Sequence, residues 1–248
     1  MALAATALAL LGALPAHAAT FNLYPSADAF VTTGPSGNLS GNNYGAAGAL
    51  SVAASGLAKG EFQSVLRFDL SAARTSFDSQ FGAGQWNLQS ITLSLTATSP
   101  NNPIFNSSAA GQFGISWMQN DSWAEGAGTP ATPTTTGITF SSLPSFTSAG
   151  DESLGTFGFN GATSGAATYT LSLTPGFLAD ASAGNLVGLH LSAADSAVSY
   201  LFDSVNFSTV SARPLLSVVA VPEPGALSLL AAGAVLLFGA RCRRKYKE

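Results

Sequence analysis

One short polar stretch holds the side chains best suited to chemistry. In "NDSWAEG", Asn120, Asp121 and Glu125 surround Trp123. Two carboxylates facing each other across a sugar could hydrolyse a glycosidic bond, whereas an exposed indole beside amide and carboxylate groups could bind a sugar ring. Asp121 and Glu125 are close together on a predicted turn, so we expect them to cap that turn or to contact a structural calcium ion. The stretch therefore favours binding over catalysis.

A second aromatic residue has a similar setting. Tyr44 follows Asn43 in "NNYG", and we expect it to be the other candidate for stacking on a ligand. An alternative stays open for both Trp123 and Tyr44, in which each ring folds back over the end of the domain as a lid on the core. The other two tryptophans, Trp86 and Trp117, are expected in the core.

The residues needed for nucleophilic catalysis or zinc binding are scarce. Outside the two ends of the chain the only histidine is His190, and the only cysteine of the sequence is Cys242, in the C-terminal tail. A nucleophile needs a base beside it, and a zinc site needs several His or Cys ligands. The alternation in "LVGLHLSAA" places His190 on the outer face of a strand, where we expect it to be solvated. We predict no catalytic residue and no metal site of this kind.

The body of the chain shows the period-two alternation of half-buried strands. "SITLSLTA" puts Ile91, Leu93 and Leu95 on one face, and "YTLSLTP" repeats the pattern. In "EFQSVLRFDLS" Arg67 and Asp69 share the other face and are expected to form a surface ion pair. Further strands are predicted over 49–54, 112–119, 155–159, 186–193, 198–203 and 214–219, separated by Gly, Ser, Asn and Pro clusters. With no convincing helix in the body, the pattern predicts an all-β, antiparallel sandwich of the jelly-roll kind.

The N-terminal end has the features of an export signal. "MALAATALALLGALPAHAA" is an apolar run that ends in Ala16-His17-Ala18, the small-x-small pattern of a signal-peptide cleavage site. We predict a signal peptide over residues 1–19.

The C-terminal end combines three parts in quick succession. Pro222, Glu223 and Pro224 come first, and an uncharged apolar run over 225–240 follows, long enough for a helix of roughly 24 Å. A basic cluster closes the chain: Arg241, Arg243, Arg244, Lys245 and Lys247. We predict a single transmembrane helix over 225–240 with its basic tail (241–247) in the cytoplasm, and an extended, accessible strip around the two prolines. A buried C-terminal helix and an ordinary anchor with a proline-rich stalk are the alternatives.

Between these ends, residues 20–220 form one predicted domain. It carries four basic and eleven acidic side chains, a net charge of −7. An acidic body repels nucleic acid and anionic membrane surfaces, so neither is an expected partner of the domain. Because the body lacks cysteine, its stability must come from a hydrophobic core rather than from disulfides.

The three parts of the tail resemble the PEP-CTERM sorting signal of Gram-negative bacteria. The resemblance implies an exported precursor held in the inner membrane, which an exosortase-type membrane protease cuts near the PEP motif over 221–248. It also implies a mature protein at the cell surface or in the extracellular matrix of a biofilm, because such tails accompany exopolysaccharide production.

The body resembles the DNRLRE-type domain, an extracellular β-sandwich related to carbohydrate-binding modules. The motifs that carry this resemblance are, in order, "DAFV", "NNYGAAGALSV", "SVLRFDLS", "SITLSL", "NDSWAEG", "FDSVNF" and "RPLLSV". Residues 129–167 depart from the pattern, and a generic jelly roll is the alternative. The resemblance implies a non-catalytic protein that binds extracellular polysaccharide. A polysaccharide-active lyase or hydrolase is the alternative.

Overall fold

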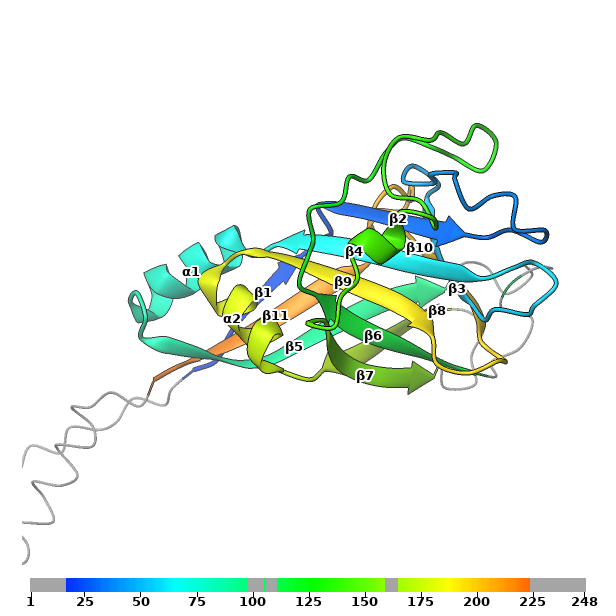
Figure 1. The fold of residues 1–248 in the computed structure, drawn as a ribbon. Coiled ribbons are helices and arrows are strands. Elements are labelled where there is room, and N and C mark those ends of the chain that lie inside the picture. Colours follow the sequence, from blue (N-terminus) through cyan, green and yellow to red (C-terminus); the bar gives the residue numbers. More distant parts are fainter. Residues whose placement is uncertain (1–16, 98–104, 106–110, 159–164, 224–248) are drawn as a thin grey trace, which may run out of the picture.

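The computed structural model describes residues 17–97, 105, 111–158 and 165–223, and Figure 1 shows their arrangement. Eleven strands are present: β1 (Ala19–Leu23), β2 (Ala27–Thr32), β3 (Ala49–Ala53), β4 (Phe62–Asp69), β5 (Trp86–Ala97), β6 (Gln112–Met118), β7 (Glu152–Gly158), β8 (Gly165–Leu171), β9 (Leu186–Ala193), β10 (Ser199–Asp203) and β11 (Leu215–Pro222). The helical elements are α1 (Ser71–Phe81), α2 (Pro175–Ala183), η1 (Leu143–Ser145) and η2 (Val210–Ala212).

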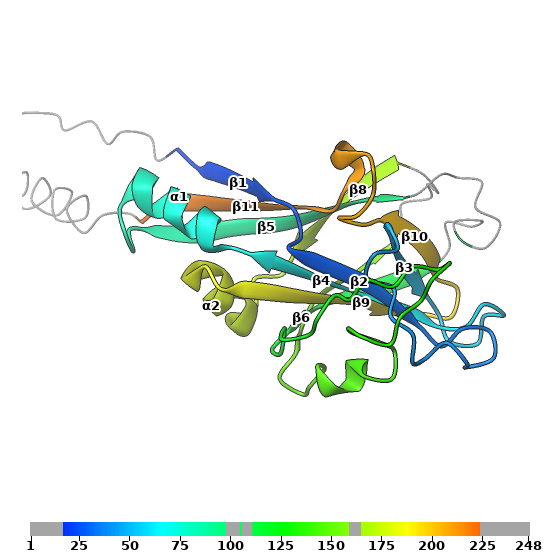
Figure 2. The same cartoon turned by 90° about the horizontal axis from the view of Figure 1, so that it is seen from above.

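All pairings between these strands are antiparallel, and the strands form two layers. The hydrogen-bonded order is β1-β11-β5-β10-β3-β4-β9-β6-β7, with β2 also paired to β4 and β8 to β5. Seen from above, β1, β11 and β5 lie in one layer and β2, β4, β9 and β6 in the other (Figure 2). The prediction of an all-β, sandwich-like fold built from antiparallel strands is confirmed at this level.

The main core lies between the layers, and it consists of the apolar faces that the alternation predicted. Leu93 is fully buried, and in register it lies between Leu216 of β11 and Tyr169 of β8. Leu66 and Leu189, paired on β4 and β9, face the same core from the other layer. Trp86 and Trp117 also belong to this core, as predicted. Successive side chains of a strand point to opposite faces of the sheet, so every second side chain of β4, β9 and β6 points away from this core.

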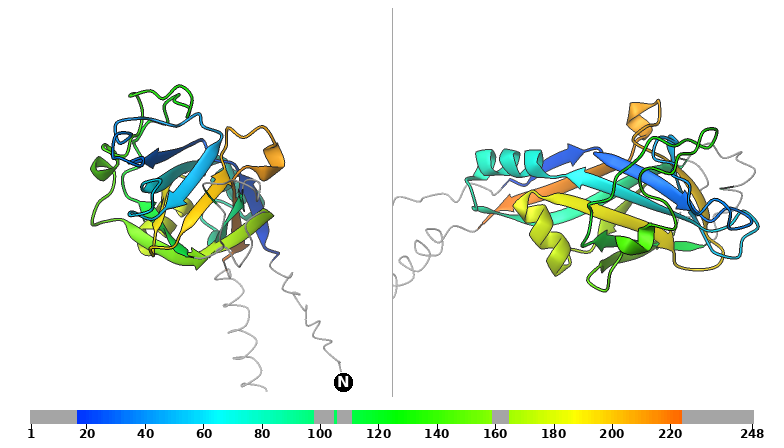
Figure 3. Two further views of the ribbon diagram at one scale, coloured as in Figure 1. Left: turned by 90° about the vertical axis from the view of Figure 1, so that its right-hand side faces the viewer. Right: turned by 45° about the horizontal axis from the view of Figure 1, so that its top comes forward.

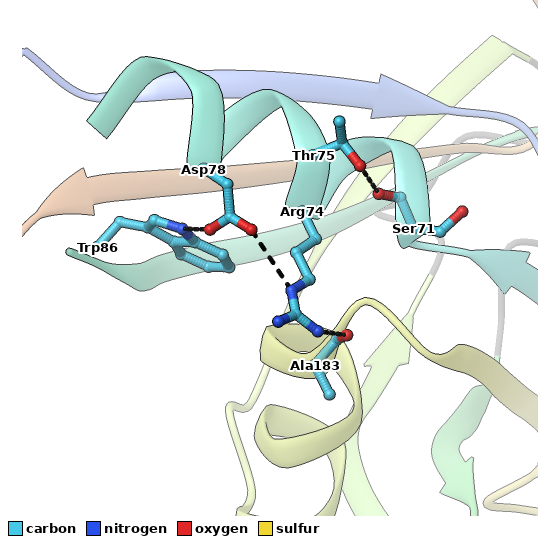
Figure 4. A network of polar contacts seen from close by, with 6 residues as sticks. All are labelled: Ser71, Arg74, Thr75, Asp78, Trp86 and Ala183. Carbon is cyan, nitrogen blue, oxygen red and sulfur yellow. Dashed lines mark hydrogen bonds and ion pairs between the residues drawn. The ribbon is translucent and has the colours of Figure 1, made fainter. Parts of the chain in front are cut away.

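Two helices correct the expectation that the body contains none. Both α1 and α2 pack at one end of the sandwich (Figure 1). The indole Nε1 of Trp86 in β5 donates to a carboxylate oxygen of Asp78 in α1 over 2.8 Å. Arg74 of α1 forms an ion pair with Asp78 and donates to the carbonyl of Ala183 in α2 (Figure 4). Pro175 occupies the first turn of α2, where its missing N–H costs nothing.

The end of β11 corrects a second expectation. Pro222 pairs with Trp86, and the N–H of Glu223 donates to the carbonyl of Gln85 over 2.9 Å. The first part of the PEP motif is thus extended and, at Glu223, exposed, as predicted, but it is the last segment of a sheet rather than a separate strip. Residues 1–16 of the predicted signal peptide (1–19), Pro224, the apolar run over 225–240 and the basic tail lie outside the described residues. Among the helices of the described part of the chain, none is long and apolar enough to cross a membrane.

Candidate functional site

A long loop over residues 119–151 covers the outer face of the second layer. Its apolar side chains form a second core with the outward-facing residues of β2, β4 and β6: Ala27, Ala29, Val31, Val65, Met118, Trp123, Ile138 and Leu143. Figure 2 shows the loop, in green, on the side of this layer that faces away from β5, and the views in Figure 3 place it at the surface of the molecule. The loop therefore forms a third layer over part of the sandwich.

Trp123 anchors this loop and is not exposed. Trp123 is only 1% accessible, so no ligand can stack on its ring. The ring is buried, as in the lid alternative, but in the second core on the outer face of the sheet rather than over the end of the domain. The guanidinium of Arg67 lies over the ring at 4.9 Å from its centroid and donates to the carbonyls of Asp121 and Trp123 over 2.9 and 2.7 Å. Arg67 thus binds the loop, which corrects the predicted ion pair with Asp69. The carboxylate of Asp69 instead accepts the N–H of Ser71.

Asn43 holds the middle of the same loop to the sheet. Its buried amide nitrogen donates to the carbonyls of Glu125 and Ile138 over 2.6 and 2.8 Å, and its oxygen accepts the N–H groups of Gly45 and Gly128. Since every polar atom of this side chain is engaged, Asn43 positions the loop and has no group left for a ligand.

Tyr44 is the other aromatic candidate, and it is also buried. It is 4% exposed and stacks on Phe30 of β2, with ring centroids 4.7 Å apart. Its hydroxyl oxygen accepts a hydrogen bond from Asn42. Both predicted stacking platforms are therefore part of the packing that joins loops to the sheet.

The polar neighbours of Trp123 separate into different surroundings. Asn120 is exposed and donates to the carbonyl of Ser145 in η1. Burial raises the pKa of the half-buried Asp121, against the opposing effect of Arg67, and the charge of Asp180 adds to the rise. Glu125 instead accepts the N–H of Asp28. Asp121 and Glu125 therefore face different partners, and the structure does not bring them together as a pair.

The structure offers a cleft that none of the predicted site residues lines. It has a volume of about 240 Å³ and lies between the loop and the outer face of β4, β9 and β6. The sheet contributes Gln63, Ser116 and His190, and the loop contributes Phe140, Leu143, Pro144, Thr147 and Asp151. The volume is below the roughly 300–1,000 Å³ of sites for drug-sized ligands, so the cleft suits a single ring or a chain end.

His190 is the central polar group of this cleft. It is half-buried rather than solvated as predicted, and its Nε2 lies 2.6 Å from Oε1 of Gln63. The Gln63 amide nitrogen donates to Glu61 over 2.5 Å, which orients the amide oxygen toward the histidine, so Nε2–H is the donor. Burial lowers the pKa of His190 to about 4, although Asp151 acts to raise it. At neutral pH the cleft therefore presents an uncharged imidazole.

The residue types of a catalytic triad also line the cleft. Ser116 is the cross-strand partner of His190, and Asp151 lies at the same opening. In the described residues, however, no hydrogen bond joins His190 to either side chain: its Nε2 bonds Gln63, and the Asp151 carboxylate accepts the N–H groups of Gln119 and Ser148. The contact between nucleophile and base that defines a triad is missing in this arrangement.

Sequence reasoning missed this cleft because its walls come together only in the fold. The alternation of polar and apolar residues does place Gln63, Ser116 and His190 on outer strand faces, and this is the only trace of the cleft in the sequence. Nothing in the sequence indicates that β4, β9 and β6 are neighbours, or that residues 140–147 lie over them. In the described part of the chain, no group of three or more His, Cys, Asp or Glu side chains gathers as a metal site.

The comparisons with known proteins concern the end of the chain. Residues 220–245 match the PEP-CTERM protein-sorting motif, and this match confirms the predicted resemblance of the tail to that sorting signal. The motif indicates an exported precursor, anchored in a membrane, that an exosortase sorts to the cell surface. A search of curated proteins found no match to the chain.

Proposed function

We propose that this protein is a non-catalytic surface or matrix protein whose sandwich domain binds extracellular polysaccharide in the cleft between β4, β9, β6 and the loop. The sorting motif supplies the location, because it delivers the domain to the cell surface, where such polymers are found. The cleft supplies the means of binding. The earlier candidates Trp123 and Tyr44 serve the domain as structural anchors.

The chemistry of the cleft is the observation that carries this proposal. A sugar ring presents hydroxyl groups at its edge and C–H groups on its faces, so it needs hydrogen-bonding groups beside an apolar surface. Gln63 and the uncharged His190 offer the hydrogen-bonding groups, and the half-buried Phe140 offers the apolar surface. The DNRLRE-type resemblance of the body points to the same class of ligand.

A polysaccharide-active enzyme is the second candidate. The observation that favours it is the presence of Ser116, His190 and Asp151 in one cleft, because substrate binding can tighten contacts that are loose in its absence. Incubation of the protein with the glycans that it binds, followed by chromatography for shortened or deacylated products, separates the enzyme from the binding protein. Product formation that Ser116→Ala abolishes would establish the enzyme.

A glycan array followed by titration calorimetry tests the binding proposal, with the full chain in detergent. Gln63→Ala and Thr147→Ala remove hydrogen-bonding groups from the two walls of the cleft, and each should weaken affinity about tenfold. Thr168→Ala is the matched control, because its hydroxyl bonds Ser94 on the other layer. We expect the control to bind like wild type. Loss of affinity in the control but not in the cleft variants would contradict the proposed location, and an array without any bound glycan would contradict the function.

A further inference from the structure

The cleft between the sheet and the loop over 119–151 has a negative charge without a positive one to balance it. Among the described residues that line it, Asp151 contributes a carboxylate, and none is an arginine or a lysine. His190 is uncharged at neutral pH, because burial lowers its pKa to about 4. In the described part of the chain no basic side chain forms an ion pair with Asp151. A cation in this cleft would therefore meet a carboxylate that lacks a counter-ion.

Hydrogen bonds within the loop hold the Asp151 carboxylate in place and leave it able to accept another. Its Oδ1 accepts the N–H of Gln119 over 3.0 Å and the hydroxyl of Ser148 over 3.1 Å, and its Oδ2 accepts the N–H of Ser148 over 3.1 Å. An ionised carboxylate has about four acceptor positions, so these bonds leave a position on Oδ2. Because Asp151 is half-buried at the opening of the cleft, a bound molecule can reach it.

The sheet wall of the cleft also presents an acceptor. Nε2–H of His190 donates to Gln63 over 2.6 Å, so Nδ1 is the unprotonated nitrogen of the neutral ring and accepts hydrogen bonds. The charge of Asp151 acts on His190, where it opposes the effect of burial on the pKa, so the two groups are within electrostatic range. The hydroxyls of Ser116 and Thr147 line the same space. The cleft thus suits a ligand group that is positive and rich in N–H donors.

We propose that the cleft binds an amino sugar, a hexosamine unit whose nitrogen is a free ammonium group rather than an acetamide. This inference rests on the proposed function and names its class of ligand, a polysaccharide with unacetylated hexosamine units. An ammonium carries a positive charge and three N–H donors, which match the Asp151 carboxylate and the acceptors around it. An acetamide has one N–H and no charge, and the acid group of a uronic acid would repel Asp151.

The charge of the whole domain favours the same ligands. The body has a net charge of −7, so it attracts cationic glycans and repels anionic ones over a longer range. Two of its four basic side chains are engaged within the fold, since Arg67 donates to carbonyls of the loop and Arg74 pairs with Asp78. Attraction to the whole domain and binding in the cleft differ in which acidic residue must be removed to weaken them.

A glycan array and calorimetric titration test this inference, with the full chain in an uncharged detergent. We expect the bound glycans to be those with free amino groups. Chemical N-acetylation of such a glycan provides the matched ligand, and it should weaken affinity for wild type about tenfold, because it removes a charge-assisted hydrogen bond. Asp151→Asn should lower affinity for the free amine to the same extent. Its unchanged affinity for the N-acetylated form would show that the variant folds.

Asp195→Asn is the matched control. Asp195 also accepts backbone N–H groups, from Gln112 and Val198, but it does not line the cleft. The variant removes the same charge from the domain and should bind the free amine like wild type. Equal loss of affinity in Asp195→Asn and Asp151→Asn, or no loss in Asp151→Asn, would overturn the inference. Wild type that binds only neutral, N-acetylated or uronic acid glycans would overturn it and leave the proposed function intact, whereas an array without any bound glycan would overturn both.

Discussion

At the scale of single residues, several polar side chains that could carry chemistry instead hold the loop to the sheet. Arg67 reaches the backbone of Asp121 and Trp123, and Asn43 bonds the backbone on both sides of the loop. Gly126, which has a φ of 79°, illustrates how closely these parts approach, because a Cβ there would come within 2.2 Å of the Asn43 oxygen. Arg67, Asn43 and Gly126 thus serve to hold the loop against the sheet.

Truncation of Trp123 tests its structural role. Trp123→Ala should lower the free energy of unfolding by about 3–5 kcal/mol, because it leaves a cavity in the second core and removes the ring beneath Arg67. Tyr24→Ala, at a side chain that is 44% exposed, is the control and should change stability little. Chemical denaturation measures both. A Trp123→Ala variant with wild-type stability but weakened glycan binding would contradict the structural role and support the prediction that a ligand stacks on Trp123.

The pKa of Asp28 predicts an unusual dependence of stability on pH. Its pKa rises from 3.8 to about 7 on folding, so between these values the folded protein holds a proton that the unfolded chain has lost. The contribution of Asp28 to stability is therefore fully present below pH 3.8 and is lost as the pH rises toward 7, by on the order of 4 kcal/mol.

Asp28→Asn should remove this part of the pH dependence. Asp203, with its pKa raised to about 6, acts in the same direction, but it is common to both proteins and cancels in the difference. Urea unfolding of wild type and variant at pH 4 and pH 7 measures it. If the stability difference between the two proteins is the same at both pH values, Asp28 does not titrate as described.

At the scale of elements, the predicted strands were largely right because each leaves its period in the sequence. Leu93 and its neighbours in β5 face the core as the alternation requires. The helices left no such signal: α1 buries only Ala73 and Phe77 and has no side-chain cap, and α2 begins with a Pro-Gly pair that resembles a turn. The loop over 119–151 has no period at all, and its conformation depends on Arg67 and Asn43, which are distant in sequence.

The pairing of β11 with β5 bears on processing of the tail. Val221 lies opposite Asn87, so the sheet reaches the PEP motif with no linker between them. A protease cleft binds its substrate as a single extended strand, and a strand already paired to a sheet cannot enter it. We therefore expect the last residues of β11 to separate from β5 before cleavage.

A cross-link between the two strands tests this expectation. Directly opposed residues of antiparallel strands are close enough for a disulfide, so Asn87→Cys with Val221→Cys should lock the end of β11 in an oxidising compartment. Cys242→Ser in every variant prevents mispairing. The double-cysteine precursor should accumulate uncut in the native host, whereas each single-cysteine variant is processed. A fully processed and disulfide-bonded product would show that the strand end stays paired during cleavage.

At the scale of the whole molecule, the protein is an export precursor whose sandwich is delivered by its tail. The strand β1 begins at Ala19, the last residue of the predicted signal peptide, and pairs with β11, the strand that leads into the sorting motif. The helix α1 contacts both strands, so it lies at the end of the domain nearest the motif (Figure 1). The cleft belongs to the layer of β2, β4, β9 and β6, in which β1 and β11 take no part (Figure 2).

The fate of the tail in the native host tests this account most directly. Glu223→Ala removes the acidic residue of the motif matched over 220–245, and Glu61→Ala in the body is the charge-matched control. Electrophoretic mobility and cell fractionation report the result. The account predicts that the Glu223→Ala protein stays in the membrane fraction at the precursor mass, while wild type and Glu61→Ala reach the mature mass and leave the membrane. Equal mature mass and equal release for all three proteins would contradict it.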